Sequence, residues 1–184
     1  MRVAQIVEDS ISEGPGRRLA IWLQGCSIRC KSCCNPYMLN PEGGFNLSQE
    51  EVIRLLKRAK EDGIEGISIL GGEPFDQPSA LFFLIEQARD LGLGTIIFTG
   101  YTISELNKCR DIRDILSMVD LIIDGPYIAS QHSKRRRWIG SNNQEIHYIS
   151  DRYMGYNFEE GYQSIDIHLK DGELTINGWP MEVF

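Results

Sequence analysis

Four cysteines stand within nine positions of the sequence, in the stretch GCSIRCKSCCNP. Cys26, Cys30 and Cys33 are separated by three and two residues, and Cys34 follows directly. Structural zinc sites commonly use two distant ligand pairs, whereas this chain has one cluster and three histidines without paired spacing. Three thiolates on a short loop can instead reach three corners of a cubane iron–sulfur cluster. Ordinary electron-transfer clusters take four cysteines, so three would leave one iron open for chemistry. A zinc site and unligated thiols stay open as alternatives.

Two cysteines are expected to lie outside this ligand set. Cys34 is adjacent to Cys33, and neighbouring side chains point apart in most backbone conformations. Cys109 falls three residues after Leu106 and three before Ile112. That helical spacing predicts a buried thiol that behaves as a small hydrophobic residue.

Other residues suited to chemistry follow apolar runs that read as strands. The segment GGEP, residues 71–74, combines glycines that allow close backbone approach with a carboxylate that can pair with a cationic group. FTGYT follows the next apolar run and DGPY the one after it. Parallel barrels place their active sites at the carboxyl ends of consecutive strands. We therefore expect these three loops and the cysteine loop to converge.

The intervening segments carry signals for the elements that would position these loops. Apolar runs at 18–24, 66–70, 94–98 and 119–124 predict four buried strands, and the run at 2–8 predicts a peripheral one. Helices are predicted from a capping box at Ser48 to Gly63 and from Pro78 to Leu91. A third, interrupted helix is predicted from a second capping box at Thr102 to about residue 118.

Alternation of strands and helices predicts an α/β fold with a parallel sheet. The chain is shorter than a full eight-unit barrel usually requires, so we expect an incomplete, TIM-like barrel. After residue 140 the pattern becomes β-rich, with a possible strand at 145–150 and a hairpin over 162–178 that turns at Asp171-Gly172. We expect one domain over 1–184, with its βα core at about 18–125 and a C-terminal extension at 140–184.

Composition excludes several classes of protein. The 184 residues include 42% hydrophobic and 24% charged residues, which are ordinary globular values. No apolar run reaches the length of a membrane span, and the N-terminus lacks signal-peptide features. A cytoplasmic protein with reduced thiols is therefore expected. The net charge of −7 argues against general nucleic-acid binding. Trp22 and Trp179 are expected in the core or in a hydrophobic cap.

The cysteine spacing after an apolar strand, followed by GGEP, resembles the radical S-adenosylmethionine (SAM) superfamily. The segments TGYTISEL, VDLIIDGPYI and GSNNQEI are similar to those of activating enzymes of anaerobic ribonucleotide reductase. EGPGRRLAIWLQGC is similar to the opening of the wider glycyl-radical-activase group. The resemblance covers residues 6–149 and does not extend to the hairpin.

This resemblance implies an enzyme with two cofactors. Cys26, Cys30 and Cys33 would hold a 4Fe-4S cluster whose fourth iron is chelated by SAM. One electron from the cluster would cleave SAM into methionine and a 5′-deoxyadenosyl radical, which removes a hydrogen atom from a glycine of a partner enzyme. The residues implied in SAM binding are Gly71, Gly72, Glu73, Pro74, Thr99, Gly100 and Asp124.

The resemblance also implies partners. The substrate would be a glycyl-radical enzyme, namely the large subunit of anaerobic ribonucleotide reductase, and the electron donor a flavodoxin or ferredoxin. The basic loop, residues 134–137, is interpreted as a solvated face, as a docking site for an acidic partner or a redox donor, or as a nucleic-acid contact. Two other hypotheses remain: a radical SAM enzyme that modifies another peptide, and an iron–sulfur protein without catalysis. GGEP argues against the second, because an electron carrier needs no site for a cationic group.

Overall fold

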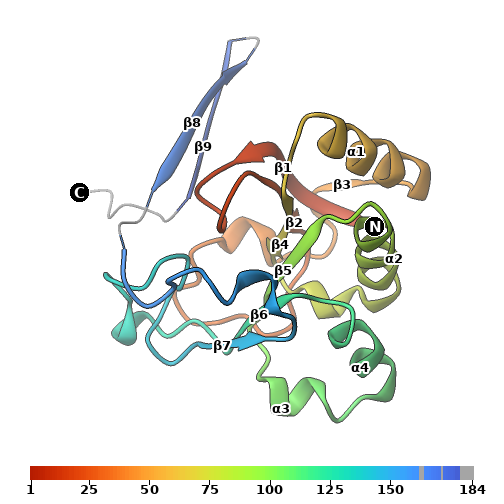
Figure 1. Cartoon of the computed structure of the whole chain (residues 1–184). Helices are drawn as coiled ribbons and strands as arrows, with labels where there is room; N and C mark the ends of the chain where they lie inside the picture. Colours follow the sequence, from red (N-terminus) through yellow and green to blue (C-terminus); the bar gives the residue numbers. More distant parts are fainter. Residues whose placement is uncertain (162–163, 171, 179–184) are drawn as a thin grey trace.

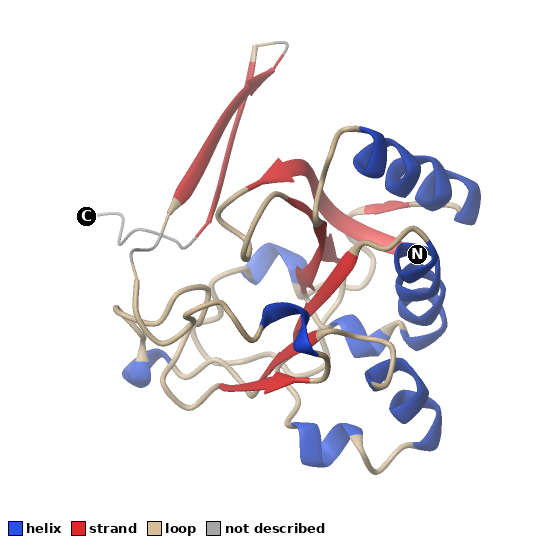
Figure 2. Ribbon diagram, in the orientation of Figure 1, coloured by secondary structure: helices blue, strands red, loops and turns tan. Residues whose placement is uncertain are grey.

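The computed structural model describes residues 1–161, 164–170 and 172–178, and its centre is a seven-stranded sheet (Figures 1 and 2). The strand order is β3-β1-β2-β4-β5-β6-β7. The strands are β1 (Arg2–Ser10), β2 (Arg18–Leu23), β3 (Phe45–Asn46), β4 (Gly66–Gly71), β5 (Gly94–Phe98), β6 (Leu121–Asp124) and β7 (Glu145–Tyr148). The four central strands, β2, β4, β5 and β6, are parallel, and antiparallel strands flank them on both sides.

The predicted α/β fold and its four buried strands are confirmed. The sheet has β3 and β7 as its edge strands, so the structure shows an open mixed sheet, and the incomplete barrel stays a prediction. A separate hairpin of β8 (Ile165–Lys170) and β9 (Glu173–Gly178) confirms the predicted C-terminal one. Asp171, the first residue of its predicted turn, and Trp179 lie outside the described residues.

The main helices cover one face of the sheet. They are α1 (Gln49–Glu61), α2 (Pro78–Asp90), α3 (Ile103–Leu106) and α4 (Arg110–Leu116). The main core joins aliphatic side chains of α1, α2 and α4 to those of the central strands. Both capping boxes are present, with Ser48 and Glu51 starting α1 and Thr102 and Glu105 starting α3. The opposite face carries two smaller apolar clusters and is covered by loops.

Cys109 corrects the sequence prediction. It is exposed rather than buried, because the helix predicted to run through it is broken between α3 and α4. Its backbone is extended, at φ −97° and ψ 125°, where it precedes α4. The helical spacing that relates it to Leu106 therefore does not hold.

None of the helices in the described part of the chain has the length and apolar character that a membrane span needs.

A buried arginine lies at the amino end of β2, opposite the end where the predicted functional loops lie. Arg18 is 0% exposed. Its guanidinium donates hydrogen bonds to Ser68 Oγ at 3.1 Å, to Tyr153 Oη at 2.5 Å and to the carbonyl groups of Ile67 and Gly94. These neutral acceptors replace water around the charge, and burial lowers the pKa of Arg18.

We therefore expect Tyr153→Phe to destabilise the protein by about 1–3 kcal/mol, because it leaves a buried charged donor without an acceptor. Equilibrium unfolding in urea would measure the loss. Tyr156→Phe is the matched control, since Tyr156 is exposed; equal losses for the two variants would contradict this role of Arg18.

Candidate active site

The cysteine loop and the GGEP loop are joined through their backbones. The amide of Gly72 donates to the carbonyl of Leu23 at 2.7 Å, and the amide of Glu73 donates to that of Gly25 at 2.8 Å. A Cβ atom on Gly72 would lie 1.9 Å from the Gly25 oxygen. Glycine is therefore required at position 72, and the two loops meet at the carboxyl ends of β2 and β4.

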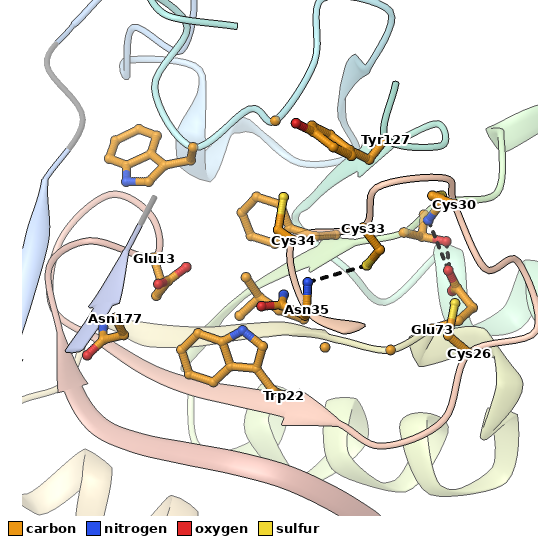
Figure 3. Close-up of a pocket in the computed structure, with 18 of the residues that line it drawn as sticks. Glu13, Trp22, Cys26, Cys30, Cys33, Cys34, Asn35, Glu73, Tyr127 and Asn177 are labelled. Carbon is orange, nitrogen blue, oxygen red and sulfur yellow. Dashed lines mark hydrogen bonds between the residues drawn. The ribbon is translucent and has the colours of Figure 1, made fainter. Parts of the chain in front are cut away.

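The three predicted ligands line one cavity of about 260 Å³. Cys26, Cys30 and Cys33 are half-buried free thiols. Figure 3 shows Cys26 beside Glu73 and Cys33 nearer the middle of the cavity. The left-handed backbone of two residues between them, Arg29 at φ 52° and Ser32 at φ 61°, bends the loop around the cavity.

These cysteines fit a cluster better than a single ion. Among the described residues, the cysteine sulfurs are not gathered within 4.8 Å of one another as the ligands of one ion would be. A cubane spreads its ligands over different irons. Backbone amides also point at the sulfurs: Asn35 N–H donates to Cys33 Sγ at 3.4 Å, and those of Ile28 and Arg29 donate to Cys26. Burial raises the pKa of Cys26, and the hydrogen bonds from Ile28 and Arg29 lower it by less.

Cys34 lines the same cavity but has a different partner. Its thiol accepts a hydrogen bond from the phenol of Tyr127, and the two side chains lie together in Figure 3. Burial raises the pKa of Cys34, and the neighbouring Cys33 raises it further. The protonated thiol is therefore favoured at Cys34.

Glu73 is a buried carboxylate with donors on both oxygens. Its Oε1 accepts from Phe75 N at 3.0 Å and from Thr99 Oγ1 at 2.8 Å, and its Oε2 accepts from Gly100 N at 2.9 Å. Glu73 is 1% exposed, and burial raises its pKa to about 7 despite these hydrogen bonds. A positively charged or amino group placed in the cavity would favour the ionised form.

The other predicted SAM-binding residues divide into two groups. Gly71, Gly72, Thr99 and Gly100 line the cavity with Glu73. Pro74 is buried at the start of a short 3-10 helix, Pro74–Asp76, which fixes the end of the GGEP loop.

Asp124 lies at the end of β6 and is not among the residues that line the cavity with the thiols. Its Oδ2 accepts from Ile103 N at 2.5 Å and lies 3.1 Å from His147 Nε2. Asp124 thus positions the start of α3 and the strand β7. Its role in SAM binding stays a prediction.

The far end of the cavity was not predicted from the sequence. Trp22, which is buried as expected, points into the cavity, and Glu13 and Asn177 close its other end (Figure 3). Burial raises the pKa of Glu13 to about 7. The acidic residue before the glycines of EGPG was a sequence signal for this position, whereas Asn177 comes from the hairpin, which carried no motif.

Two residues of the basic loop contact other parts of the chain, and the other two are exposed. Arg136 Nε lies 2.8 Å from Glu159 Oε2, and its Nη1 donates to the carbonyl of Gln144 at 2.7 Å. The guanidinium of Arg137 lies 4.2 Å from the ring centroid of Trp138, which lines the cavity. Lys134 and Arg135 are exposed.

Comparisons with known proteins agree with this geometry. Residues 12–147 match the family described as a 4Fe-4S single cluster domain. An anaerobic ribonucleoside-triphosphate reductase-activating protein of Vibrio cholerae is 29% identical over 157 residues, which cover 80% of this chain and 97% of that protein. One of Escherichia coli K12 is 24% identical over 155 residues, with 81% and 99% covered. The pyruvate formate-lyase-activating enzyme of Clostridium pasteurianum is 32% identical over 126 residues, with 66% and 50% covered.

The site predicts how each cysteine affects iron binding. Protein reconstituted with iron and sulfide without oxygen should bind about four irons, as a cubane requires. Cys30→Ala should prevent normal cluster assembly. Cys34→Ala should keep the iron content, because the Cys34 thiol is hydrogen-bonded to Tyr127.

Iron and sulfide analysis with the visible spectrum would measure these effects. Cys109→Ala is the control for general thiol loss, since that thiol is exposed and remote from the cavity. Loss of iron in Cys34→Ala equal to that in Cys30→Ala would contradict the three-ligand assignment.

Proposed function

The chain belongs to the 4Fe-4S single cluster domain family, and from this premise we propose that it is a radical SAM activase that generates a glycyl radical on a partner enzyme. The observation that supports this most is the shared cavity of three free thiols and one buried carboxylate. The named relatives, which activate anaerobic ribonucleoside-triphosphate reductase or pyruvate formate-lyase, support the type of reaction. We also infer that the open sheet, with helices on one face and the cavity on the other, is an incomplete barrel.

The protein's own residues would hold and orient the reactants. Cys26, Cys30 and Cys33 would bind the 4Fe-4S cluster. Glu73 would accept hydrogen bonds from the amino group of SAM, and Gly72 would leave room for the amino-acid end of SAM. When bound, these two cofactors would supply one-electron reductive cleavage of SAM and removal of a hydrogen atom from a glycine Cα, with methionine and 5′-deoxyadenosine as products beside the glycyl radical.

The remaining cavity lining suits a radical reaction. Trp22, Ile28, Leu70, Phe98 and Trp138 present apolar surface to the cavity. Such a lining excludes water and limits side reactions of a reactive intermediate. This lining would thus protect the intermediate. Glu73 at one end of the cavity, and Glu13 and Asn177 at the other end, supply polar groups.

The partner and the cellular setting follow from this function. We infer that the substrate is the large subunit of an anaerobic ribonucleotide reductase, because two of the reported relatives are named for it. A flavodoxin or ferredoxin would supply the electron. Free thiols at all five cysteines suit a reducing, cytoplasmic environment.

Glu73→Gln should leave the iron content unchanged and weaken SAM binding about tenfold to a hundredfold. The reason is the loss of a charge-assisted hydrogen bond in a buried site, about 1.5–3 kcal/mol. Anaerobic calorimetry would measure the affinity. Glu86→Gln is the control, since Glu86 is exposed on α2; equal affinities for the two variants would refute this role of Glu73.

The proposed function is tested by mixing the reduced, reconstituted protein with SAM and the anaerobic ribonucleotide reductase of the same organism. A glycyl doublet in the paramagnetic resonance spectrum of the reductase is expected, together with 5′-deoxyadenosine. Cys30→Ala should give neither product. Deoxyadenosine without any glycyl signal would instead identify a radical SAM enzyme that acts on a different peptide.

A further inference from the structure

The hairpin β8–β9 carries an apolar face that residues 1–161, together with the hairpin's own described residues, leave exposed. Ile167 pairs with Ile176 across the strands, and Leu169 pairs with Leu174. These four side chains are 59–76% exposed, and Ile165 on the same face is 39% exposed. We call these five residues the apolar hairpin face. Monomeric proteins rarely expose apolar patches larger than about 300–600 Å² unless the patch binds something.

The opposite face of the hairpin fixes it to the body of the protein. Asp166 Oδ2 accepts hydrogen bonds from Ser10 Oγ at 2.7 Å and from Ser12 Oγ at 2.9 Å. Asn177 Nδ2 donates to Ser12 Oγ at 3.0 Å. Asp166 and Asn177 are buried in this contact. The base of the hairpin is therefore fixed through its polar face, and β8 and β9 extend from there beyond the body (Figure 1).

The base of the hairpin continues into the proposed active site. Ser164, Ile176, Asn177 and Gly178 line the same cavity as the three cysteines. Ile176 belongs both to this lining and to the apolar hairpin face. A macromolecule that places one of its segments in the cavity would therefore meet the apolar hairpin face beside it.

We propose that the apolar hairpin face is the docking surface for the glycyl-radical enzyme, whose glycine-bearing segment enters the adjoining cavity. This inference rests on the proposed function and names the element that recognises the partner. Trp138, next to the basic loop, lines the same cavity, and Lys134 and Arg135 of that loop are exposed. The complementary partner surface is thus apolar and bordered by acidic side chains.

A second copy of this chain suits the surface less well. A stable interface takes about 20–30 residues on each partner, whereas the apolar hairpin face has five. Two copies would also bring together chains that each carry a net charge of −7. A partner that contacts both the hairpin and the cavity rim has the larger area available.

The test compares two double variants of the full chain, each reconstituted with its cluster. Ile167→Ser with Leu169→Ser removes two side chains of the apolar hairpin face. Ile149→Ser with Met154→Ser removes two exposed apolar side chains outside the hairpin. The measurements are the binding of each variant to the immobilised anaerobic ribonucleotide reductase of the same organism, its mass in solution, and the 5′-deoxyadenosine formed without the reductase.

The hairpin variant should bind the reductase at least tenfold more weakly, while the control variant binds like the wild type. Both should form deoxyadenosine at the wild-type rate, because neither changes the residues assigned to the cofactors. Equal binding by all three proteins would overturn the docking proposal and leave the proposed function intact. A wild-type dimer that the hairpin variant abolishes would assign the surface to a second copy and would also overturn it. If the wild-type protein neither binds nor activates the reductase, the proposed function fails, and the docking proposal fails with it.

Discussion

The close backbone contact between Gly25 and Gly72 is the constraint on which the rest of the site depends. It continues the parallel pairing of β2 and β4 beyond the strand ends, so that the loops after both strands share one edge. The cysteine loop continues along the chain from Gly25, and Glu73 directly follows Gly72. A side chain at position 72 would occupy the space of the Gly25 carbonyl. The predicted cluster ligands and the Glu73 carboxylate are thus placed relative to each other by hydrogen bonds between main-chain groups.

A buried ionisable side chain lies at each end of the central strands. At the amino ends of these strands, Arg18 is buried among neutral oxygens that include the hydroxyl of Tyr153. At the carboxyl ends, Glu73 is buried among neutral donors, and burial raises its pKa. Around both side chains, neutral hydrogen-bonding groups of the chain replace water.

Sequence reasoning succeeded where local chemistry decides structure. Cysteine spacing, capping boxes at Ser48 and Thr102, and apolar strands each depend on residues within a few positions. It failed at one local break, since Cys109 was placed by extending one helical period across the gap between α3 and α4. It also failed where distant segments meet, because the hydrogen bond between Ser10 and Asp166 joins residues 156 positions apart. Arg18 gave no signal, because its acceptors come from other strands and from the segment around Tyr153.

The part of the chain that matches the family ends at residue 147, within β7, and the hairpin follows it. The hairpin returns to Ser10 and Ser12, where the matched part begins. The amino-terminal boundary of the matched part therefore lies against the hairpin. Because Ile176 and Asn177 of this hairpin also line the cavity, any change in the length of β8–β9 would reshape the wall of the site together with the surface that lies beyond it.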